Sequence, residues 1–112
     1  MAQNKKHEFN KDEIDLADIA KALSHPARIA ILKEIAKHDT CICGEIVEVL
    51  PLAQSTVSQH LKELLNAGVI SGTIDGTKSC YCINWKVFEK FEKSFASFFN
   101  HAKSFETKRN CC

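Results

Sequence analysis

The spacing of apolar side chains predicts two helices at the start of the chain. Within residues 12–23, apolar side chains recur at intervals of three and four, as on one face of a helix. They are Leu16, Ile19, Ala20 and Leu23. The run Ser24-His25-Pro26 interrupts the pattern, and because proline is tolerated in the first turn of a helix, a second helix is expected to start near Pro26. Its expected buried stripe consists of Ile29, Leu32, Ile35 and Ala36.

The middle of the chain predicts a short helix, a turn and a longer helix. Residues 38–44 break the helical pattern, and a short helix is expected over residues 45–50, followed by a turn at residues 51–53. The longer helix is expected over residues 54–67, with Gly68 just beyond its C-terminal end. Its apolar face consists of Val57, Leu61, Leu64 and Leu65.

After Gly68 the pattern changes from helical to extended. Residues 69–74 and 77–83 are expected to form a β-hairpin, because Asp75-Gly76 suits the tight turn between them. Asn84 then provides a helix cap, and a last helix is expected to run to about Phe105.

The last helix carries a stripe rich in phenylalanine. Steps of 3, 4, 3, 4 and 3 residues connect Phe88, Phe91, Phe95, Phe98, Ala102 and Phe105, an approximate coiled-coil seam. A domain of this size is expected to leave part of the stripe uncovered, which favours a second copy of the chain as the cover. Packing of the stripe on the chain's own core is the alternative. The expected dimer interface consists of Leu16, Ile19, Phe88, Phe91, Phe95 and Phe98.

The order of elements predicts a winged helix-turn-helix. The fold class is mainly α (α+β), with about five helices and a two-stranded β-hairpin wing. Residues 12–106 are expected to form a single DNA-binding and dimerisation domain. Residues 1–11 are expected to be a disordered tail, and residues 107–112 a flexible tail that contains cysteines.

Composition is that of an ordinary globular protein. The chain has 112 residues, 45% hydrophobic and 26% charged, which fits one domain. Its longest apolar stretch is far shorter than the roughly 20 residues of a membrane span, and the N-terminus has no signal-peptide core, so a cytoplasmic location is expected. The net charge of +1 does not by itself indicate a nucleic-acid partner. The prediction of DNA binding therefore rests on the order of elements.

The helix over residues 54–67 is the expected DNA-reading helix. In a helix-turn-helix the second helix lies in the major groove, where glutamine can pair with adenine and serine, threonine or lysine can contact bases or phosphates. The alternative is that these side chains only solvate one face of an amphipathic helix. The expected DNA-binding residues, including one on the wing, are Gln54, Ser55, Thr56, Ser58, Gln59, His60, Lys62 and Lys78.

Two stretches of the chain carry a family resemblance. Residues 22–32, Ala-Leu-Ser-His-Pro-Ala-Arg-Ile-Ala-Ile-Leu, resemble the opening signature of the ArsR/SmtB family of metal-sensing repressors. Residues 55–64, Ser-Thr-Val-Ser-Gln-His-Leu-Lys-Glu-Leu, resemble its recognition helix. The resemblance implies a homodimer that binds an imperfect inverted repeat in double-stranded DNA and is released by an inducer.

Six cysteines in three close pairs indicate chemistry of reduced thiols. The pairs are Cys41/Cys43, Cys80/Cys82 and Cys111/Cys112, and close pairs chelate more readily than they connect distant segments. By the resemblance, Cys41 and Cys43 match the Cys-x-Cys pair of arsenic-responsive members. The third cysteine that some members carry shortly afterwards is absent.

Trivalent arsenic or antimony, the expected inducer, favours three thiolates, so one ligand is unassigned. Cys111 and Cys112 are expected to supply it, the alternative being a tail with incidental thiols. Cys80 and Cys82 alternate on a strand and share one face, and we expect them to be structural residues packed beneath the wing. On an ideal helix, Cys41 and Cys43 would not face each other, so ligation is expected to distort the turn that positions the DNA-reading helix.

Other functions remain open at this stage. A repressor of the same fold that responds to zinc, cadmium or oxidation is the nearest alternative. His101 is the only histidine on the last helix, and it is expected to be structural. A thiol protein that buffers metal without specific DNA binding is an alternative of another class. No catalytic motif is present in the sequence, so an enzyme is not expected.

Overall fold

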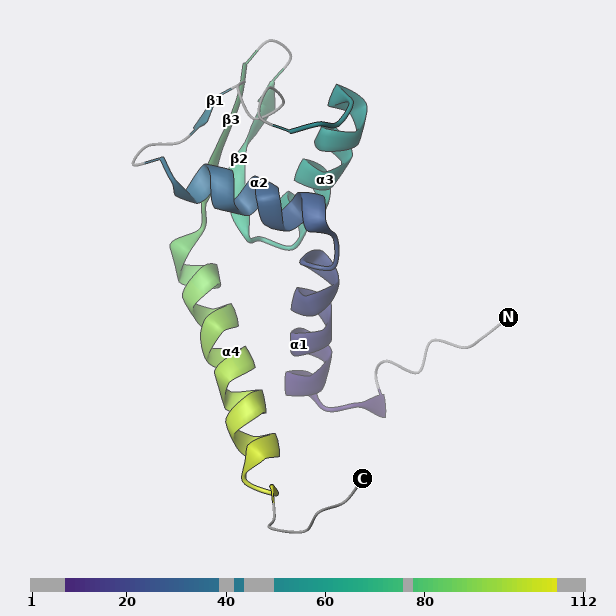
Figure 1. Ribbon diagram of the computed structural model, residues 1–112, viewed down its shortest axis with the longest axis vertical. Coiled ribbons are helices and arrows are strands. Elements are labelled where there is room, and N and C mark those ends of the chain that lie inside the picture. The colour runs from purple at the N-terminus through teal and green to yellow at the C-terminus, as the bar shows by residue number, and fades with distance from the viewer. Residues whose placement is uncertain (1–7, 39–41, 44–49, 76–77, 107–112) are drawn as a thin grey trace, which may run out of the picture.

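The computed structural model describes residues 8–38, 42–43, 50–75 and 78–106, with the backbone alone for residues 42–43, 73–75 and 78–79. Its elements follow the predicted order (Figure 1). They are α1 (Lys11–Ala22), α2 (Pro26–Ala36), β1 (Ile42–Cys43), α3 (Gln54–Asn66), β2 (Ile70–Asp75), β3 (Lys78–Ile83) and α4 (Trp85–Lys103). The short helix predicted over residues 45–50 falls almost wholly outside the described residues. So do residues 1–7 and 107–112 of the two predicted tails.

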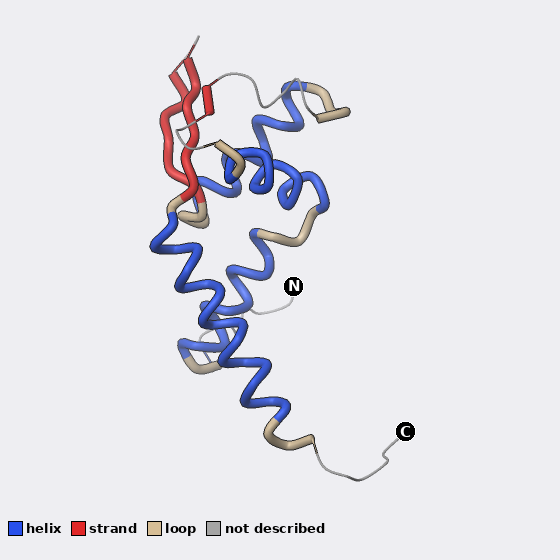
Figure 2. The backbone as a smooth tube through the Cα atoms, turned by 60° about the vertical axis from the view of Figure 1, so that its left-hand side comes forward, coloured by secondary structure: helices blue, strands red, loops and turns tan. Residues whose placement is uncertain are grey.

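The molecule is elongated, with a mixed helix-and-sheet region at one end and a pair of helices at the other. Helices α2 and α3 and the sheet form a head at one end, whereas α1 and α4 lie side by side as an arm at the other (Figure 1). Figure 2 shows the same division from a second direction, with α4 continuing away from the sheet. The extents of 56 × 38 × 27 Å reflect this arm. No helix among the described residues is long and apolar enough to cross a membrane.

The hydrophobic core lies in the head. Helix α2 contributes Ile31, Leu32 and Ile35, and α3 packs against it with the apolar face that its spacing predicts. Ile29, which was predicted to be buried, is 41% exposed, and Ile31 is fully buried instead. The prediction was wrong because α2 is apolar around most of its circumference, so its spacing alone does not define one buried face. The core residues are Ile31, Leu32, Ile35, Val57, Leu61, Leu64, Val69, Ile70, Tyr81 and Ile83.

The end of α3 is formed by a glycine-dependent cap. Gly68 has a φ of +80°, a conformation that side chains with a Cβ rarely adopt. Its backbone N–H donates to the Leu65 carbonyl at 3.0 Å, and the Val69 N–H donates to the Leu64 carbonyl at 3.2 Å. These two bonds are those of a Schellman motif, which turns the chain from α3 directly into β2. The predicted role of Gly68 is confirmed.

The sheet has three strands rather than the two predicted. The antiparallel order is β1-β3-β2, with Ile42 opposite Tyr81 and Cys43 opposite Cys80. A strand of two residues has no periodicity of its own, so only its pairing with β3 reveals it. The hairpin of β2 and β3 was predicted correctly, and residues 76–77, which connect the two strands, are not described.

Side-chain caps position the two helices of the arm. The Asn10 side chain accepts from the Glu13 N–H at 2.8 Å, and the Glu13 side chain accepts from the Asn10 N–H at 3.2 Å. This capping box starts α1 at Lys11. The Asn84 side chain accepts from the Val87 N–H at 3.3 Å and starts α4, as its position in the sequence predicts.

Candidate nucleic-acid interface and cysteine positions

Helix α3 presents a polar face to solvent because its apolar face is in the core. Val57, Leu61 and Leu64 are buried, which turns the remaining side of the helix outward. Lys62 gives this face a positive charge, and Gln59 donates from Nε2 to Oε1 of Glu63 at 3.4 Å. Ser58 is half-buried at the edge of the face. The exposed members of the predicted DNA-binding set are Gln54, Ser55, Thr56, Gln59 and Lys62.

His60 does not belong to this outward face. It was predicted to contact DNA, but its side chain is only 8% exposed. Its ring lies 4.4 Å from the His25 ring, measured between centroids. Arg28 donates from Nε to Nδ1 of His60 at 3.2 Å. The prediction was wrong because the helical position of His60, next to Leu61 and one turn from Val57, lies at the margin of the buried face, where tertiary contacts decide its orientation.

Arg28 connects three helices at the junction of head and arm. Its Nη1 atom donates to the backbone carbonyls of Lys21 and Ala22, both at 3.3 Å, while its Nε atom donates to His60 on α3. Arg28 itself lies in the first turn of α2, which His25 caps by accepting from the Ala27 N–H at 2.9 Å. The end of α1, the start of α2 and the middle of α3 are therefore held together by a single guanidinium group. Sequence reasoning missed this role, because no local pattern connects Arg28 to His60, 32 residues further along the chain.

The environment of His60 favours its neutral form. Burial lowers the pKa of His60 below its usual 6.5, and the positive potential of His25 and Arg28 lowers it further, against a smaller opposite effect of Glu63. The hydrogen bond from Arg28 requires an unprotonated Nδ1 atom on His60. The polar groups at this junction are thus arranged for a neutral imidazole.

Three of the six cysteines lie on described strands. Cys43 is on β1 and Cys80 and Cys82 are on β3, whereas Cys41, Cys111 and Cys112 lie outside the described residues. The side chains of Cys43 and Lys78 are not described either. Among the described residues, no group of three histidine, cysteine, aspartate or glutamate side chains that could hold a metal ion occurs.

Cys80 and Cys82 lie on the sheet face that points away from the core. Tyr81 and Ile83, which alternate with them along β3, are buried in the core, so the two cysteines belong to the opposite face. Both are half-buried and both are disulfide-bonded. Their side chains therefore do not enter the core beneath the wing, and the structural role expected for them stays a prediction.

The arm leaves aromatic side chains uncovered. None of the 19 residues of α4 is fully buried, and Phe98 and Phe105 are 50% and 68% exposed. Of the predicted dimer residues, Phe88 and Phe91 pack against the chain's own core, and Ile19 is already buried within the chain.

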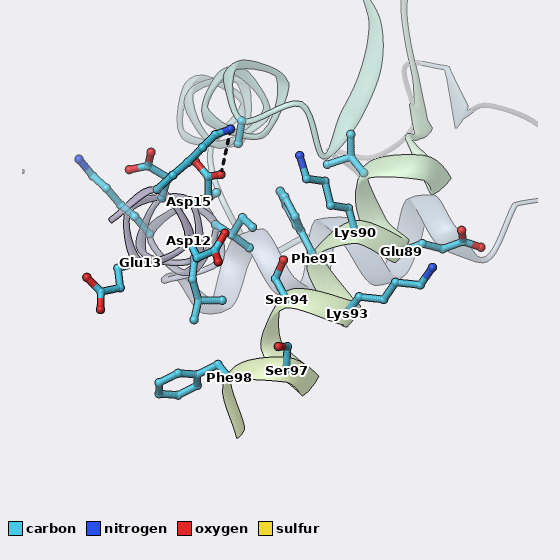
Figure 3. Close-up of a pocket in the computed structure, with 18 of the residues that line it drawn as sticks. Asp12, Glu13, Asp15, Glu89, Lys90, Phe91, Lys93, Ser94, Ser97 and Phe98 are labelled. Atoms are coloured by element: carbon cyan, nitrogen blue, oxygen red, sulfur yellow. Dashed lines mark ion pairs between the residues drawn. The ribbon is translucent and has the colours of Figure 1, made fainter. Parts of the chain in front are cut away.

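A groove separates α1 from α4 (Figure 3). Phe91, Ser94 and Phe98 of α4 line it. The α1 side carries carboxylates, including Asp12 and Asp15, and the α4 side carries Lys90 and Lys93. Lys11 and Asp15 form an ion pair at 3.7 Å along α1. The uncovered apolar surface of the arm is thus bordered by charges of both signs.

Comparison with known proteins places the head among bacterial regulators. The family described as "Bacterial regulatory protein, arsR family" matches residues 25–71, which include α2, α3 and the start of β2. The transcriptional repressor PagR of Bacillus anthracis is 37% identical over 70 residues, 62% of this chain and 70% of that protein. The arsenical resistance operon repressor of Bacillus subtilis is 38% identical over 65 residues, 57% of this chain and 61% of that protein.

A solved structure confirms the fold over nearly the whole chain. The crystal structure of an ArsR family transcriptional regulator aligns with 98% of this chain and 100% of its own, at a TM-score of 0.65 and 18% identity. The relatives above are repressors, in agreement with the expectation that the chain is not an enzyme.

Proposed function

The chain belongs to the ArsR family of bacterial regulatory proteins, and from that premise we propose that it is a transcriptional repressor released from DNA by trivalent arsenic or antimony. The observation that carries the proposal is the outward face of α3. This face is polar, has no acidic side chain among its exposed predicted contacts, and lies within the matched residues. Glutamine, serine and threonine at these positions suit base edges, and Lys62 suits a phosphate.

The proposed DNA-bound form is a homodimer on an inverted repeat. The uncovered phenylalanines of α4 support a second copy of the chain as partner, because monomeric proteins rarely expose large apolar patches. A two-fold dimer presents two copies of α3, which matches a DNA site made of two inverted halves. The unit proposed to bind DNA and dimerise spans residues 12–106.

Cysteine thiolates are the proposed inducer site, with Cys41 and Cys43 as the first two ligands. Support comes from the Bacillus subtilis relative, which is named as a repressor of an arsenical resistance operon. Cys43 lies on β1, whereas Cys41 lies outside the described residues.

Ligation and DNA binding are proposed to oppose each other. Strand β1 pairs with β3, and β3 pairs with β2, which follows directly from α3. An ion held at β1 would therefore change the strain on the elements that position α3. By linkage, DNA weakens ion binding by the same factor as the ion weakens DNA binding, a coupling of typically about 1–3 kcal/mol.

The test is an anisotropy titration of the full-length protein with an inverted repeat. The repeat would be obtained by selection from a random DNA pool, and the protein would be kept reduced with a phosphine, because dithiols chelate arsenite. Arsenite, antimonite, zinc, cadmium and a disulfide oxidant would then be added separately. We expect release by arsenite or antimonite, abolished in Cys41→Ser and Cys43→Ser and retained in the matched control Lys103→Ser, an exposed position on α4.

Each of the other outcomes would indicate a different function for this chain. Release only by zinc, cadmium or the oxidant would replace the inducer and leave the repressor. Ion binding without selection of any DNA sequence would make the chain a thiol buffer for metals. DNA binding that none of these agents reverses would contradict the sensor.

A further inference from the structure

The side chains of His25, Arg28 and His60 form one polar cluster where α1, α2 and α3 meet (Figure 1). His25 caps α2, Arg28 lies in its first turn, and His60 lies on the buried side of α3. The guanidinium of Arg28 donates both to the end of α1 and to His60. The cluster therefore attaches the proposed DNA-reading helix to the other two helices through polar contacts that depend on direction.

Both histidine rings accept a hydrogen bond at Nδ1. His25 accepts from the Ala27 N–H at 2.9 Å, and His60 accepts from Nε of Arg28 at 3.2 Å. A neutral imidazole has one acceptor nitrogen, whereas the protonated ring has none. Protonation of His25 would therefore remove a cap within α2, but protonation of His60 would remove a contact between α2 and α3.

The charges that face His60 oppose its protonation. Arg28 is a permanent cation at hydrogen-bond distance on one side, and His25 lies against the ring with 4.4 Å between centroids. Glu63, one turn further along α3, acts in the opposite direction. A protonated His60 would place two cations side by side at a buried position, so a ring that takes up a proton is expected to separate from Arg28.

We propose that His60 is a positioning residue for DNA binding, whose neutral ring, held by Arg28, keeps α3 in the orientation that the operator requires and whose protonation releases α3 from that orientation. The inference rests on the proposed function and adds acid to the signals that weaken operator binding. The operator must accept both copies of α3 at once, so it binds only the form with neutral rings. Contacts to phosphates alone can form in many registers and need no such orientation.

The expected effect of acid is opposite in sign to that of simple electrostatics. Protonation of exposed histidines adds positive charge and strengthens binding to any DNA. Protonation of His60 is expected to weaken operator binding, by up to about tenfold per pH unit for each subunit below the pKa of the ring. The ratio of the affinities for operator and for random DNA therefore separates the two effects.

The experiment compares His60→Asn with the matched variant His25→Asn in the full-length protein. In each, the amide oxygen takes the place of Nδ1 as an acceptor, and one titrating ring is removed. Asparagine is also a favourable helix cap, so α2 keeps its start in His25→Asn. Anisotropy titrations with the selected operator and with random DNA run from neutral to mildly acidic pH at constant ionic strength. Circular dichroism at each pH shows that the helices remain formed.

We expect the operator preference of the wild type to fall with acid and that of His60→Asn to stay constant. In His25→Asn the fall is expected at higher pH, because burial and the charge of His25 both hold down the pKa of His60. A constant preference in the wild type, or an equal fall in His60→Asn, would overturn the inference and leave the repressor intact. A fall that only His25→Asn abolishes would overturn it in favour of the α2 cap. No operator preference at neutral pH would instead contradict the proposed function.

Proton counting tests the same inference without a variant, which decides the matter if His60→Asn does not fold. Calorimetry of DNA binding in two buffers of different ionisation enthalpy gives the number of protons exchanged. Subtraction of the value for random DNA removes the protons that exposed groups take up near phosphates. We expect the operator to release more protons than random DNA at mildly acidic pH, and an equal or smaller release would overturn the inference.

Discussion

Single residues stand at the points where segments of the head come closest to each other. Gly72 on β2 lies so near β3 that an added Cβ would collide with the carbonyl oxygen of Cys80. Arg28 and His60 meet through one hydrogen bond across two helices. Neither feature adds to the apolar core, yet each constrains where a functional side chain lies.

Substitution of Gly72 by alanine is expected to destabilise the sheet next to the cysteines. The new Cβ would force β2 and β3 apart at Cys80, and overpacking of this kind costs about 1–3 kcal/mol of the free energy of unfolding. Urea denaturation would measure the loss. Ser71→Ala, at the exposed neighbouring position, is the control, and equal midpoints for the two variants would contradict the prediction.

Acidification is expected to destabilise the folded chain through His60. In the unfolded chain this histidine takes up a proton near pH 6.5, but its lowered pKa in the folded chain delays protonation to lower pH. Between these two values the unfolded state binds more protons, so the free energy of unfolding falls as the pH decreases through 6.5. Below the lowered pKa this contribution becomes constant.

Urea denaturation at several pH values from neutral to mildly acidic would measure this dependence. His60→Gln keeps an oxygen that can accept from Arg28 and removes the titration, so its stability is expected to vary less with pH. His101→Gln, an exposed position, serves as the control. A pH dependence that is identical in wild type and His60→Gln would show that other groups cause it.

At the scale of elements, the exposed face of α3 carries both a charged and several uncharged polar side chains. Lys62 is the one cation on the proposed DNA face among the described side chains, whereas Gln59 is an uncharged side chain with both a donor and an acceptor. The two are expected to affect DNA binding in different ways.

Removal of the Lys62 charge is expected to weaken binding to all DNA sequences by a similar factor. A lysine that neutralises one phosphate releases about one counterion, so Lys62→Ala would reduce the slope of log affinity against log salt by about 0.9. Anisotropy titrations at several salt concentrations would measure the slope. Lys103→Ala, on α4 at the other end of the molecule, is expected to leave it unchanged.

Removal of the Gln59 amide is expected to relax sequence preference. If Gln59 pairs with an adenine edge, Gln59→Ala would cost about 1–3 kcal/mol on the selected operator and little on random DNA. Repeating the selection with the variant would show which base pair loses its preference. An operator affinity that falls equally on both DNAs would assign Gln59 to the backbone instead.

The elements also show what the sequence can reveal. Gly68, Asn84 and the apolar face of α3 were predicted correctly, because caps and periodicity are local signals. The pairing of β1 with β3, the burial of His60 and the exposure of Ile29 were missed, because contacts between distant segments determine them. The sequence shows that Cys80 and Cys82 share one face of β3, but not which face. Only the burial of Tyr81 and Ile83 in the core shows that the two cysteines lie on the opposite face.

At the scale of the whole molecule, the arm leaves a large aromatic surface exposed to solvent. Helix α4 contacts α1, but Phe98 and Phe99 of α4 and Phe105, which follows it, are largely exposed. A second copy of the chain would bury these side chains.

Substitution of Phe98 by glutamate is expected to dissociate the proposed dimer. A charge in the buried centre of an interface opposes association, and loss of a central aromatic contact costs about 2 kcal/mol, or about a 30-fold increase in the dimer dissociation constant. Sedimentation equilibrium would measure that constant. Asn100→Glu adds the same charge at an exposed position nearby and is the control, and a monomeric wild type would contradict the dimer itself.

The contacts of Arg28 have a consequence for the geometry of the operator. This side chain fixes the angle at which the head, with α3, is attached to the arm that is proposed to dimerise. In a symmetric dimer, that angle sets the distance between the two copies of α3, and successive major grooves on one side of DNA recur every 34–36 Å or so. In the proposed dimer, the hydrogen bonds of this one guanidinium group would therefore help to set the spacing between the two halves of the operator.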